Sequence, residues 1–181
     1  RKQFLRGKKY RDEVTKCKTV SVTELVYTRW RIFSLFNVQR AIPMFCDGLK
    51  PSERKIFFTL MKHYKGKNIS DEKKTKKLEV NSFAGKVIDG AGYHHGEVSL
   101  YETTTKLARG FPGSSNLPLF YPNGDFGSRL ENGKDHSAAR YIKTSPRPLL
   151  RYIFREEDED ILQYTRDPDS GKVMEPDFYL P

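Results

Sequence analysis

The chain has 181 residues and a formal net charge of +10, and 36% of its residues are hydrophobic. This length suits one domain with extensions, and the aromatic content (12 Phe and 10 Tyr) argues against a disordered chain. There is no 18-residue apolar run and no signal-like start, so we expect neither a membrane span nor secretion. Cys17 and Cys46 lack Cys-x-x-Cys spacing, which suits a reducing compartment and excludes a cysteine-based zinc site.

Charge is distributed unevenly along the chain. Residues 155–181 carry nine acidic and three basic side chains, a balance of −6, whereas residues 1–154 carry thirty basic and fourteen acidic side chains, a balance of +16. A uniformly solvated surface would not segregate charge in this way, and a polyanionic partner explains it better. Charge alone leaves duplex DNA, RNA and an anionic membrane open. Since no basic amphipathic stretch has a clean apolar face, a membrane is the less favoured of the three.

Helical patterns dominate the first part of the chain. Residues 1–20 form a basic arm, which we interpret as a linker. Ser21 and Glu24 then have the spacing of a capping box and predict the start of a helix that runs to about Val38. A second helix is predicted after Pro51, and its buried stripe consists of Ile56, Phe57, Leu60, Met61 and Tyr64.

A lysine-rich stretch, Lys62–Lys77, follows the second helix and has no apolar periodicity, so we predict a loop or insertion there. The pattern then predicts a third helix over Glu79–Asp89, ended by Gly90 and Gly92. A fourth helix is predicted from about Gly96 to Arg109. The apolar stripe of the third helix consists of Val80, Phe83, Ala84 and Val87.

The composition changes after Phe111 to Gly, Pro, Asn and Ser with short β-prone pieces. We predict an ordered loop over 111–138, a short strand over 139–144, and a second strand or a helical turn over Leu149–Phe154. Helices followed by a small β element predict an α+β fold. Specifically, they favour a mainly helical winged helix, with a helix-turn-helix and a small β wing that grips DNA.

Arg140 and Tyr141 are the first candidates for chemistry. A tyrosine hydroxyl is mostly protonated at neutral pH and needs neighbouring cations before it can attack a phosphodiester. Arg140 is adjacent in sequence and can offer a permanently charged, planar fork to phosphate oxygens. The plainer interpretation is a tyrosine in the core or at the rim of a strand.

His94 and His95 form a second candidate group. Neighbouring residues on a helix or strand point apart, so the two imidazoles are poorly placed to bind one metal ion. A histidine that donates a hydrogen bond to phosphate or orients the nucleophile fits better. The alternative is two turn histidines that satisfy local backbone groups.

Lys50, Arg54 and Lys55 surround the start of the second predicted helix. Helix N-termini favour phosphate binding, and Lys50 and Arg54 share a face if the helix includes both. A solvated helix start is the competing interpretation. The acidic run Glu156–Asp160 is more typical of a solvated loop than of a metal site, and we predict no metal site in this chain.

Five motifs in order make the sequence resemble one family. They are Arg40-Ala41-Ile42-Pro43, Asp47-Gly48-Leu49-Lys50-Pro51, Tyr93-His94-His95-Gly96-Glu97, Gly124-Asp125-Phe126-Gly127-Ser128-Arg129 and Ala139-Arg140-Tyr141. In this order they resemble type IIA DNA topoisomerases over roughly residues 22–181. The paired histidines and the ending Glu175-Pro176-Asp177-Phe178-Tyr179-Leu180-Pro181 are similar to the eukaryotic branch.

The resemblance implies a winged-helix domain with a CAP-like helix-turn-helix, at the start of the breakage-reunion region. Tyr141 would attack the backbone of double-stranded DNA and form a 5′-phosphotyrosyl link, so that a second duplex can pass through the double-strand break. Arg140 would stabilise the transition state, and His95 would support it. The residues expected to hold the DNA backbone are Arg40, Lys50, Arg54, Lys55 and His94. The implied domains are a basic linker over 1–21, a DNA-binding and cleavage domain over 22–155, and an acidic connection over 156–181 toward a tower domain.

The resemblance also implies what the whole enzyme needs. The full-length protein would be an ATP-dependent homodimer that uses Mg²⁺ and has no membrane partner. This segment would bind neither Mg²⁺ nor ATP, so we expect the fragment alone to be inactive. Asp125 and Ala138-Ala139 depart from the family pattern, which usually has Gln and a Pro or Ser-Pro there. These departures suit topoisomerases of large DNA viruses, such as the African swine fever virus type, as well as a divergent cellular enzyme. We expect the nucleus for a cellular enzyme, and the host cytoplasm or nucleus for a viral one. The alternative function is a winged-helix DNA-binding module without chemistry.

Overall fold

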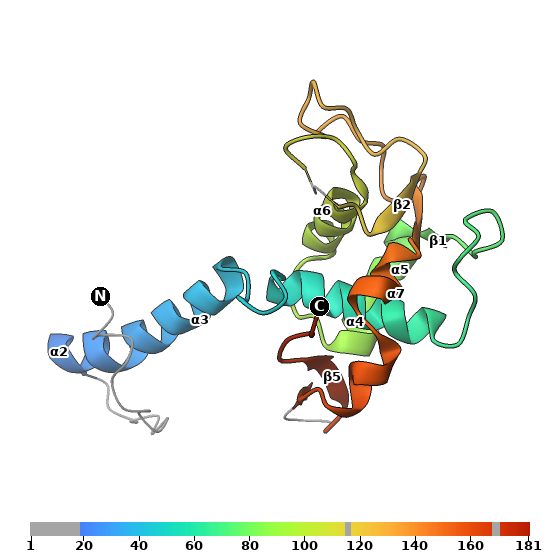
Figure 1. The fold of residues 1–181 in the computed structure, drawn as a ribbon. Coiled ribbons are helices and arrows are strands. Elements are labelled where there is room, and N and C mark those ends of the chain that lie inside the picture. The colour runs from blue at the N-terminus through green and yellow to red at the C-terminus, as the bar shows by residue number, and fades with distance from the viewer. Residues whose placement is uncertain (1–18, 115–116, 168–170) are drawn as a thin grey trace. The chain divides into compact units, whose positions relative to one another are not determined.

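A computed structural model of the chain describes residues 19–114, 117–167 and 171–181 (Figure 1). The chain divides into two compact units, Arg1–Pro43 and Met44–Pro181. The basic arm predicted over residues 1–20 lies almost entirely outside the described residues, as does the linker predicted over 1–21. In the parts of the chain that are described, no helix combines the length and the apolar character needed to cross a membrane.

A helical run forms the described part of the first unit. Ser21 caps it as predicted, because the Ser21 hydroxyl accepts a hydrogen bond from the Glu24 N–H at 3.2 Å. The run consists of α2 (Val22–Leu25), the π-helical segment η1 (Val26–Trp30) and α3 (Arg31–Ala41), and so ends three residues beyond the predicted Val38. None of the residues in these three segments is buried.

The second unit begins its helical core with α4 (Pro51–Tyr64). Pro51 occupies the first turn, where its missing N–H costs nothing, and the Lys50 N–H donates to Glu53 Oε2 at 2.9 Å. The predicted apolar stripe is confirmed, with Met61 only partly buried and the others in the core.

Two further helices complete the core of this unit, α5 (Val80–Ala91) and α6 (Glu97–Ala108), and both lie close to their predicted positions. The predicted stripe of α5 is completely buried. Gly92 ends α5 with a φ of 57°, and a Cβ there would lie 2.7 Å from the Met174 sulfur, so the position requires glycine. Helices α4, α5 and α6 pack against one another (Figure 1).

A three-stranded antiparallel sheet flanks the helices, with the order β1-β3-β2. Its strands are β1 (Leu78–Glu79), β2 (Phe120–Asn123) and β3 (Lys143–Pro146). Lys143, on the central strand β3, pairs with Glu79 on β1 and with Asn123 on β2. In chain order the unit therefore reads α4, β1, α5, α6, β2, β3. This is the predicted α+β fold, a mainly helical winged helix with a small β wing.

Two predictions for residues 111–144 were wrong. The loop predicted over 111–138 contains strand β2, and the strand predicted over 139–144 begins only at Lys143. Residues 139–142 form a turn because their carbonyl groups accept hydrogen bonds from the start of α5 and not from a neighbouring strand. Of the two alternatives left open for Leu149–Phe154, the structure shows a helix, α7 (Leu149–Ile153).

The acidic C-terminal part folds onto the same unit. Segment η2 (Glu156–Asp160) is a 3-10 helix where a solvated loop was predicted, and Glu159 pairs with Lys65 at 2.6 Å. Strands β4 (Tyr164–Arg166) and β5 (Val173–Pro176) then form an antiparallel pair, of which β5 contacts α4 and α5. Residues 156–181 thus share the compact unit of the winged helix, and their predicted role as a connection to a further domain stays a prediction.

Candidate functional site

The candidate nucleophile lies on a turn that the start of α5 holds at both ends. The Asn81 N–H donates to the Ala139 carbonyl at 3.2 Å, and the Val80 N–H donates to the Ile142 carbonyl at 3.1 Å. These N–H groups belong to the first turn of a helix, where they have no partner within the helix itself. The turn therefore caps α5, and α5 in return fixes the backbone on either side of Arg140 and Tyr141.

Side chains on this turn differ sharply in burial. Ile142 is 1% exposed and anchors the turn in the core, whereas Tyr141 is 68% exposed. The Arg140 guanidinium carbon lies 4.9 Å from the centre of the Tyr141 ring, within the range of a cation–π contact. The structure thus brings the two predicted residues together, with the tyrosine at the surface and a permanent positive charge beside it.

A hydrogen-bonded group on α5 and α6 supports the same turn. The Tyr101 hydroxyl lies 2.7 Å from both Asn81 Oδ1 and Glu97 Oε2, and Asn81 is the residue whose N–H binds Ala139. The hydrogen bond to Glu97 is the main reason that the pKa of Tyr101 is raised. This group was not predicted from the sequence, although Glu97 and Tyr101 are four apart on one helix and therefore neighbours on its surface.

Arg109 organises the loop that leads to the turn. Its Nε donates to the Phe126 carbonyl at 2.9 Å, and its Nη2 donates to the Gly133 carbonyl. Gly133 has a φ of 75°, and any Cβ there would collide with the Arg109 guanidinium. The sequence analysis did not single out Arg109. In this loop Asp125, the acidic departure from the family pattern, accepts a hydrogen bond from the Gly127 N–H at 3.0 Å and so has a local structural use.

His94 and His95 lie between α5 and α6, and both are exposed. The His95 ring packs edge-to-face against the buried Tyr93 ring, with 5.4 Å between the centroids and 77° between the planes. Within the described residues, no hydrogen bond or ring contact joins either histidine to Arg140 or Tyr141. Their predicted roles in catalysis and DNA binding stay predictions.

Arg54 has an internal partner that the sequence analysis did not foresee. Its side chain is 6% exposed, and its Nε and Nη2 donate to the Asp47 carboxylate at 2.9 and 3.0 Å. Nη2 also donates to the Leu49 carbonyl at 3.1 Å. The geometry favours a structural role in holding the loop before α4, and the predicted phosphate contact of Arg54 stays a prediction.

The Asp47 carboxylate is completely buried and accepts four hydrogen bonds. Besides the two from Arg54, it accepts from the Leu49 N–H at 2.9 Å and from the Tyr179 N–H at 3.0 Å. Burial acts to raise the pKa of Asp47, but these hydrogen bonds and the charge of Arg54 outweigh it and lower the pKa. The carboxylate is therefore a fixed negative charge that ties the C-terminal residues to the start of α4.

The other predicted DNA contacts differ in how available they are. Lys55 is engaged internally, since its Nζ donates to the Ala91 carbonyl at 2.6 Å and pairs with Glu175 at 2.8 Å. Lys50 is half-buried at the N-cap of α4. Arg40 is exposed in the last turn of α3, in the first unit. Arg40 and Lys50 are thus free enough to meet a phosphate, whereas a contact from Lys55 would break two interactions.

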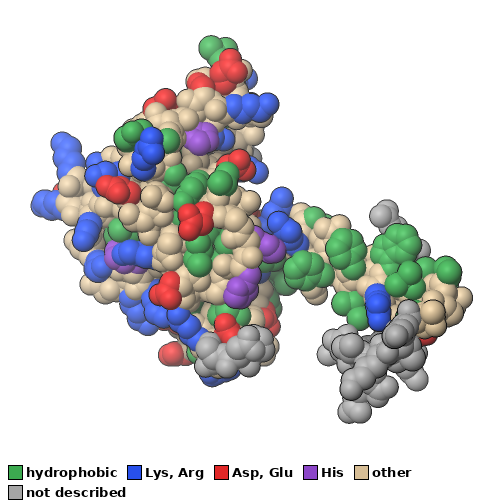
Figure 2. Space-filling view, turned by 180° about the vertical axis from the view of Figure 1, so that it is seen from behind, with side chains coloured by type: hydrophobic (Ala, Val, Ile, Leu, Met, Phe, Trp, Pro, Cys, Tyr) green, Lys and Arg blue, Asp and Glu red, His purple; other side chains and the backbone are tan. Residues whose placement is uncertain are grey.

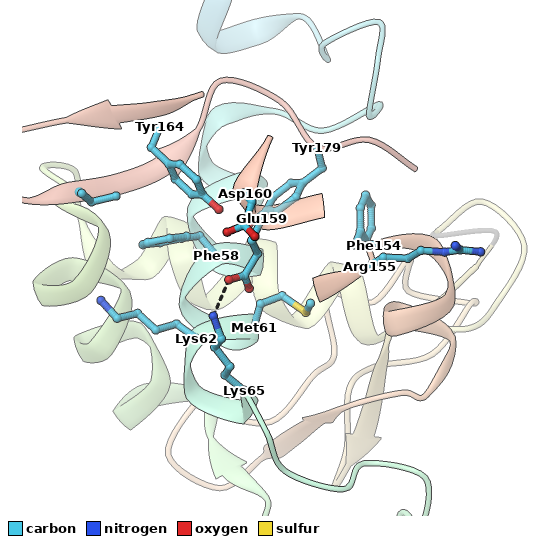
Figure 3. A pocket seen from close by; sticks show the side chains of 11 residues that line it. Phe58, Met61, Lys62, Lys65, Phe154, Arg155, Glu159, Asp160, Tyr164 and Tyr179 are labelled. Carbon is cyan, nitrogen blue, oxygen red and sulfur yellow. Dashed lines mark hydrogen bonds and ion pairs between the residues drawn. The ribbon is translucent and has the colours of Figure 1, made fainter. Parts of the chain in front are cut away.

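A cavity of about 420 Å³ lies away from the Tyr141 turn, between the C-terminal half of α4, η2 and β4 (Figure 3). Phe58 and Tyr164 lie on one side, and the Lys65–Glu159 ion pair crosses it. None of the predicted site residues lines it. In the described ranges, no group of three or more His, Cys, Asp or Glu side chains could hold a metal ion.

Comparison with known proteins assigns the family. Residues 40–181 match the sequence profile of the DNA gyrase/topoisomerase IV family, specifically its A subunits. The chain is 42% identical over 158 residues to the mitochondrial DNA topoisomerase 2 of Dictyostelium discoideum, and 39% identical over 164 residues to DNA topoisomerase 2 of Drosophila melanogaster. These matches cover 87% and 91% of this chain, and 11% of each relative. The chain therefore belongs to the type II DNA topoisomerase family, as the order of its motifs predicts.

A solved structure is similar over most of the same range. It is the DNA-binding, cleavage and re-ligation domain of Plasmodium falciparum topoisomerase II, with a TM-score of 0.77 and 36% identity. The match covers 90% of this chain and 21% of that one. The chain spans about a tenth of the length of the curated relatives, and so matches one segment of each of them.

Proposed function

We propose that this chain is the DNA-binding and cleaving segment of a type II DNA topoisomerase, with Tyr141 as the nucleophile. The observation that carries the proposal is the Ala139–Ile142 turn, which presents an exposed tyrosine beside an exposed arginine on a backbone fixed by α5. Membership of the family and the similarity to a DNA-binding, cleavage and re-ligation domain support it.

The reaction we assign to Tyr141 is a transesterification. The phenolic oxygen attacks the phosphorus of a backbone phosphodiester, a tyrosyl–phosphorus bond forms, and the bond from phosphorus to the 3′-oxygen breaks. The phenolic proton is lost, and the departing oxygen gains one to become a 3′-hydroxyl, so one phosphodiester replaces another and the reverse reaction reseals the strand. Arg140 offers two N–H groups to the non-bridging oxygens, where negative charge develops in the transition state.

The remaining predicted contacts divide by role. Arg40, Lys50 and His94 would bind phosphates that position the duplex, without reading sequence. His95 would support the reacting phosphate by donating a hydrogen bond from its exposed edge. Arg54 and Lys55 would act on DNA indirectly, by holding the start of α4, where Lys50 lies.

The whole protein would cut both strands as a homodimer and would need Mg²⁺ and ATP. The described residues provide no cluster that fits a metal ion, so we assign no step of the reaction here to a metal. We expect the 181-residue chain by itself to bind DNA and to cleave it negligibly, because the departing 3′-oxygen would lack the charge stabilisation that Mg²⁺ would supply. A nuclear location for a cellular enzyme, and an origin in a large DNA virus, stay predictions.

The decisive experiment is Tyr141→Phe in the full-length protein, with trapping of covalent protein–DNA complexes. Loss of the covalent complex with retained DNA binding is the expected result. Tyr152→Phe is the matched control, because Tyr152 is 80% exposed on α7 of the same unit and should be dispensable. A Tyr141→Phe protein that still traps DNA covalently would contradict the proposal, and a wild-type protein that binds DNA but never traps it would favour a non-catalytic DNA-binding module.

A further inference from the structure

Three lysines from separate places in the sequence converge on His63, near the end of α4. Lys67 lies in the loop after α4, Lys76 lies just before β1, and Lys86 lies on α5; we call these three the lysine cluster. The Lys67 Nζ donates to the His63 carbonyl at 2.6 Å, and the Lys86 Nζ lies 3.4 Å from His63 Nδ1. Part of the lysine-rich stretch noted in the sequence is therefore a localised site.

The electrostatic environment of His63 shows how concentrated this charge is. The pKa of His63 is lowered, first by burial and then by the positive charges of Lys86, Lys67 and Lys76. No carboxylate is among the groups that affect it. All three lysine side chains are exposed, so their charge faces solvent.

The backbone that carries Lys67 and Lys76 is held in place. Ile69 and Thr75 are buried, at 3% and 5% exposure, and the Tyr64 hydroxyl donates to the Lys76 carbonyl. The loop's own Asp71 is engaged locally, because its carboxylate accepts from the Lys73 N–H at 2.9 Å and pairs with Lys74 at 3.7 Å. The loop thus presents Lys67 and Lys76 on a fixed support, and Asp71 is engaged with groups outside the cluster.

Gathering like charges raises the free energy of the folded unit. A polyanion that binds there offsets this cost. Figure 2 shows Lys and Arg side chains gathered along the edge of the Met44–Pro181 unit where Figure 1 places the loop after α4. The surface is charged and not amphipathic, which fits a nucleic-acid backbone better than a membrane.

The cluster is also tied to the Tyr141 turn through α5. The Asn81 N–H holds the Ala139 carbonyl, and Lys86 lies five residues further along α5. Asn81 and Lys86 are therefore separated by about 7.5 Å of helical rise. Duplex DNA carries a phosphate charge about every 1.7 Å along its axis. A duplex bound at Tyr141 therefore presents several phosphates within the length of α5 that joins Asn81 to Lys86.

We propose that the lysine cluster binds backbone phosphates of duplex DNA on the flank of the segment held at the Tyr141 turn. This inference rests on the proposed function, since it names a further part of the same DNA partner's binding surface. The contacts are ionic and lie on the phosphate backbone, so they add affinity without sequence preference.

The test uses the full-length protein with Lys67, Lys76 and Lys86 changed together to Gln. Affinity for a duplex of several helical turns is measured over a range of salt concentrations. We expect the salt slope to fall by about 0.9 for each lost contact, or roughly 2 to 3 in total. Covalent trapping by Tyr141 of a duplex that is saturated with protein should be unchanged, because Arg140 and Tyr141 are intact.

Two variants control this experiment. Changing the same lysines to Arg keeps the charge and should restore the wild-type slope. Lys73→Gln with Lys74→Gln removes charge from the same loop but outside the cluster, and should have a clearly smaller effect on the slope. An unchanged salt slope in the triple Gln variant, with wild-type thermal stability, would overturn the proposal. So would an equal loss with the Lys73 and Lys74 variant. Covalent trapping by Tyr141 separates these outcomes from a failure of the proposed function.

Discussion

The loop before α4 and the turn before β3 each place an arginine in a motif that predicts contact with phosphate, yet the structure uses the two arginines differently. Arg54 is buried and its charged donors meet the Asp47 carboxylate and a carbonyl. Arg140 is exposed and lies against the Tyr141 ring. Among the described residues, Arg140 forms no ion pair with a carboxylate.

The difference follows from the cost of burying charge. A buried guanidinium must have its charge balanced and its donors satisfied within the protein, which leaves nothing for a ligand. An exposed guanidinium beside an aromatic ring keeps its outer N–H groups available. The same residue type therefore stabilises the fold in one place and can stabilise a transition state in the other.

The largest expected effect that tests this contrast is the loss of stability in Arg54→Met. It would leave Asp47 buried without its charge partner, and breaking a buried pair in this way costs about 3–5 kcal/mol. Urea unfolding of the 181-residue chain, followed by circular dichroism, measures the loss. Lys62→Met, on the exposed side of the same helix, should change the free energy of unfolding by less than about 0.5 kcal/mol. Equal effects of the two changes would show that Arg54 has no special role in the fold.

Arg140→Gln should lower the rate of cleavage and leave stability unchanged, in contrast to Arg54→Met, which should lower stability. We expect the rate of DNA cleavage by the full-length protein to fall by about 10²–10³-fold, the size of effect seen when one donor to a developing oxyanion is removed. Thermal stability should stay at the wild-type value, because the side chain is exposed. Arg140→Lys keeps the charge but loses the planar fork, so its rate should lie between the two. An unchanged cleavage rate in Arg140→Gln would limit Arg140 to packing on Tyr141.

The smallest expected effect is on the acid dependence of stability. Because the pKa of Asp47 is lowered in the folded state, its carboxylate stabilises the fold above the ordinary value of 3.8. That contribution is lost as the pH falls from there through the lower folded pKa. Asp47→Asn should therefore be less stable at neutral pH and should lose less further stability in acid, as measured by urea unfolding at several pH values. Glu157→Gln, which removes an exposed carboxylate, should keep the wild-type acid dependence.

Much of the fold could be predicted because its helices carry their own signals. The apolar stripes of α4 and α5, the Ser21 cap and the end of α5 at Gly92 depend on residues close together in sequence. The turn at 139–142 could not be predicted in this way, since its conformation depends on N–H groups that lie much earlier in the chain. Taken alone, the local sequence of residues 139–144 resembles a strand, and only the distant hydrogen-bond partners show that its first part is a turn.

Candidate site residues could be proposed from the sequence, but the groups that support them could not. Arg140 and Tyr141 were proposed because their motif lies in order with four others. Arg109 and Asn81 were missed because each acts through a carbonyl group, and a backbone acceptor leaves no trace in the sequence. The burial of Arg54 was missed for a related reason, because a buried and an exposed basic residue at the start of a helix have the same local sequence pattern.

The backbone clamp on the Ala139–Ile142 turn has a consequence for how the sequence around Tyr141 can drift. The contacts that fix the turn run from the N–H groups of α5 to carbonyl oxygens, which every amino acid possesses. Ala138 and Ala139 can then be replaced by other small residues without moving Tyr141. The residues that flank Tyr141 can thus change, while the position of the tyrosine is set by the start of α5.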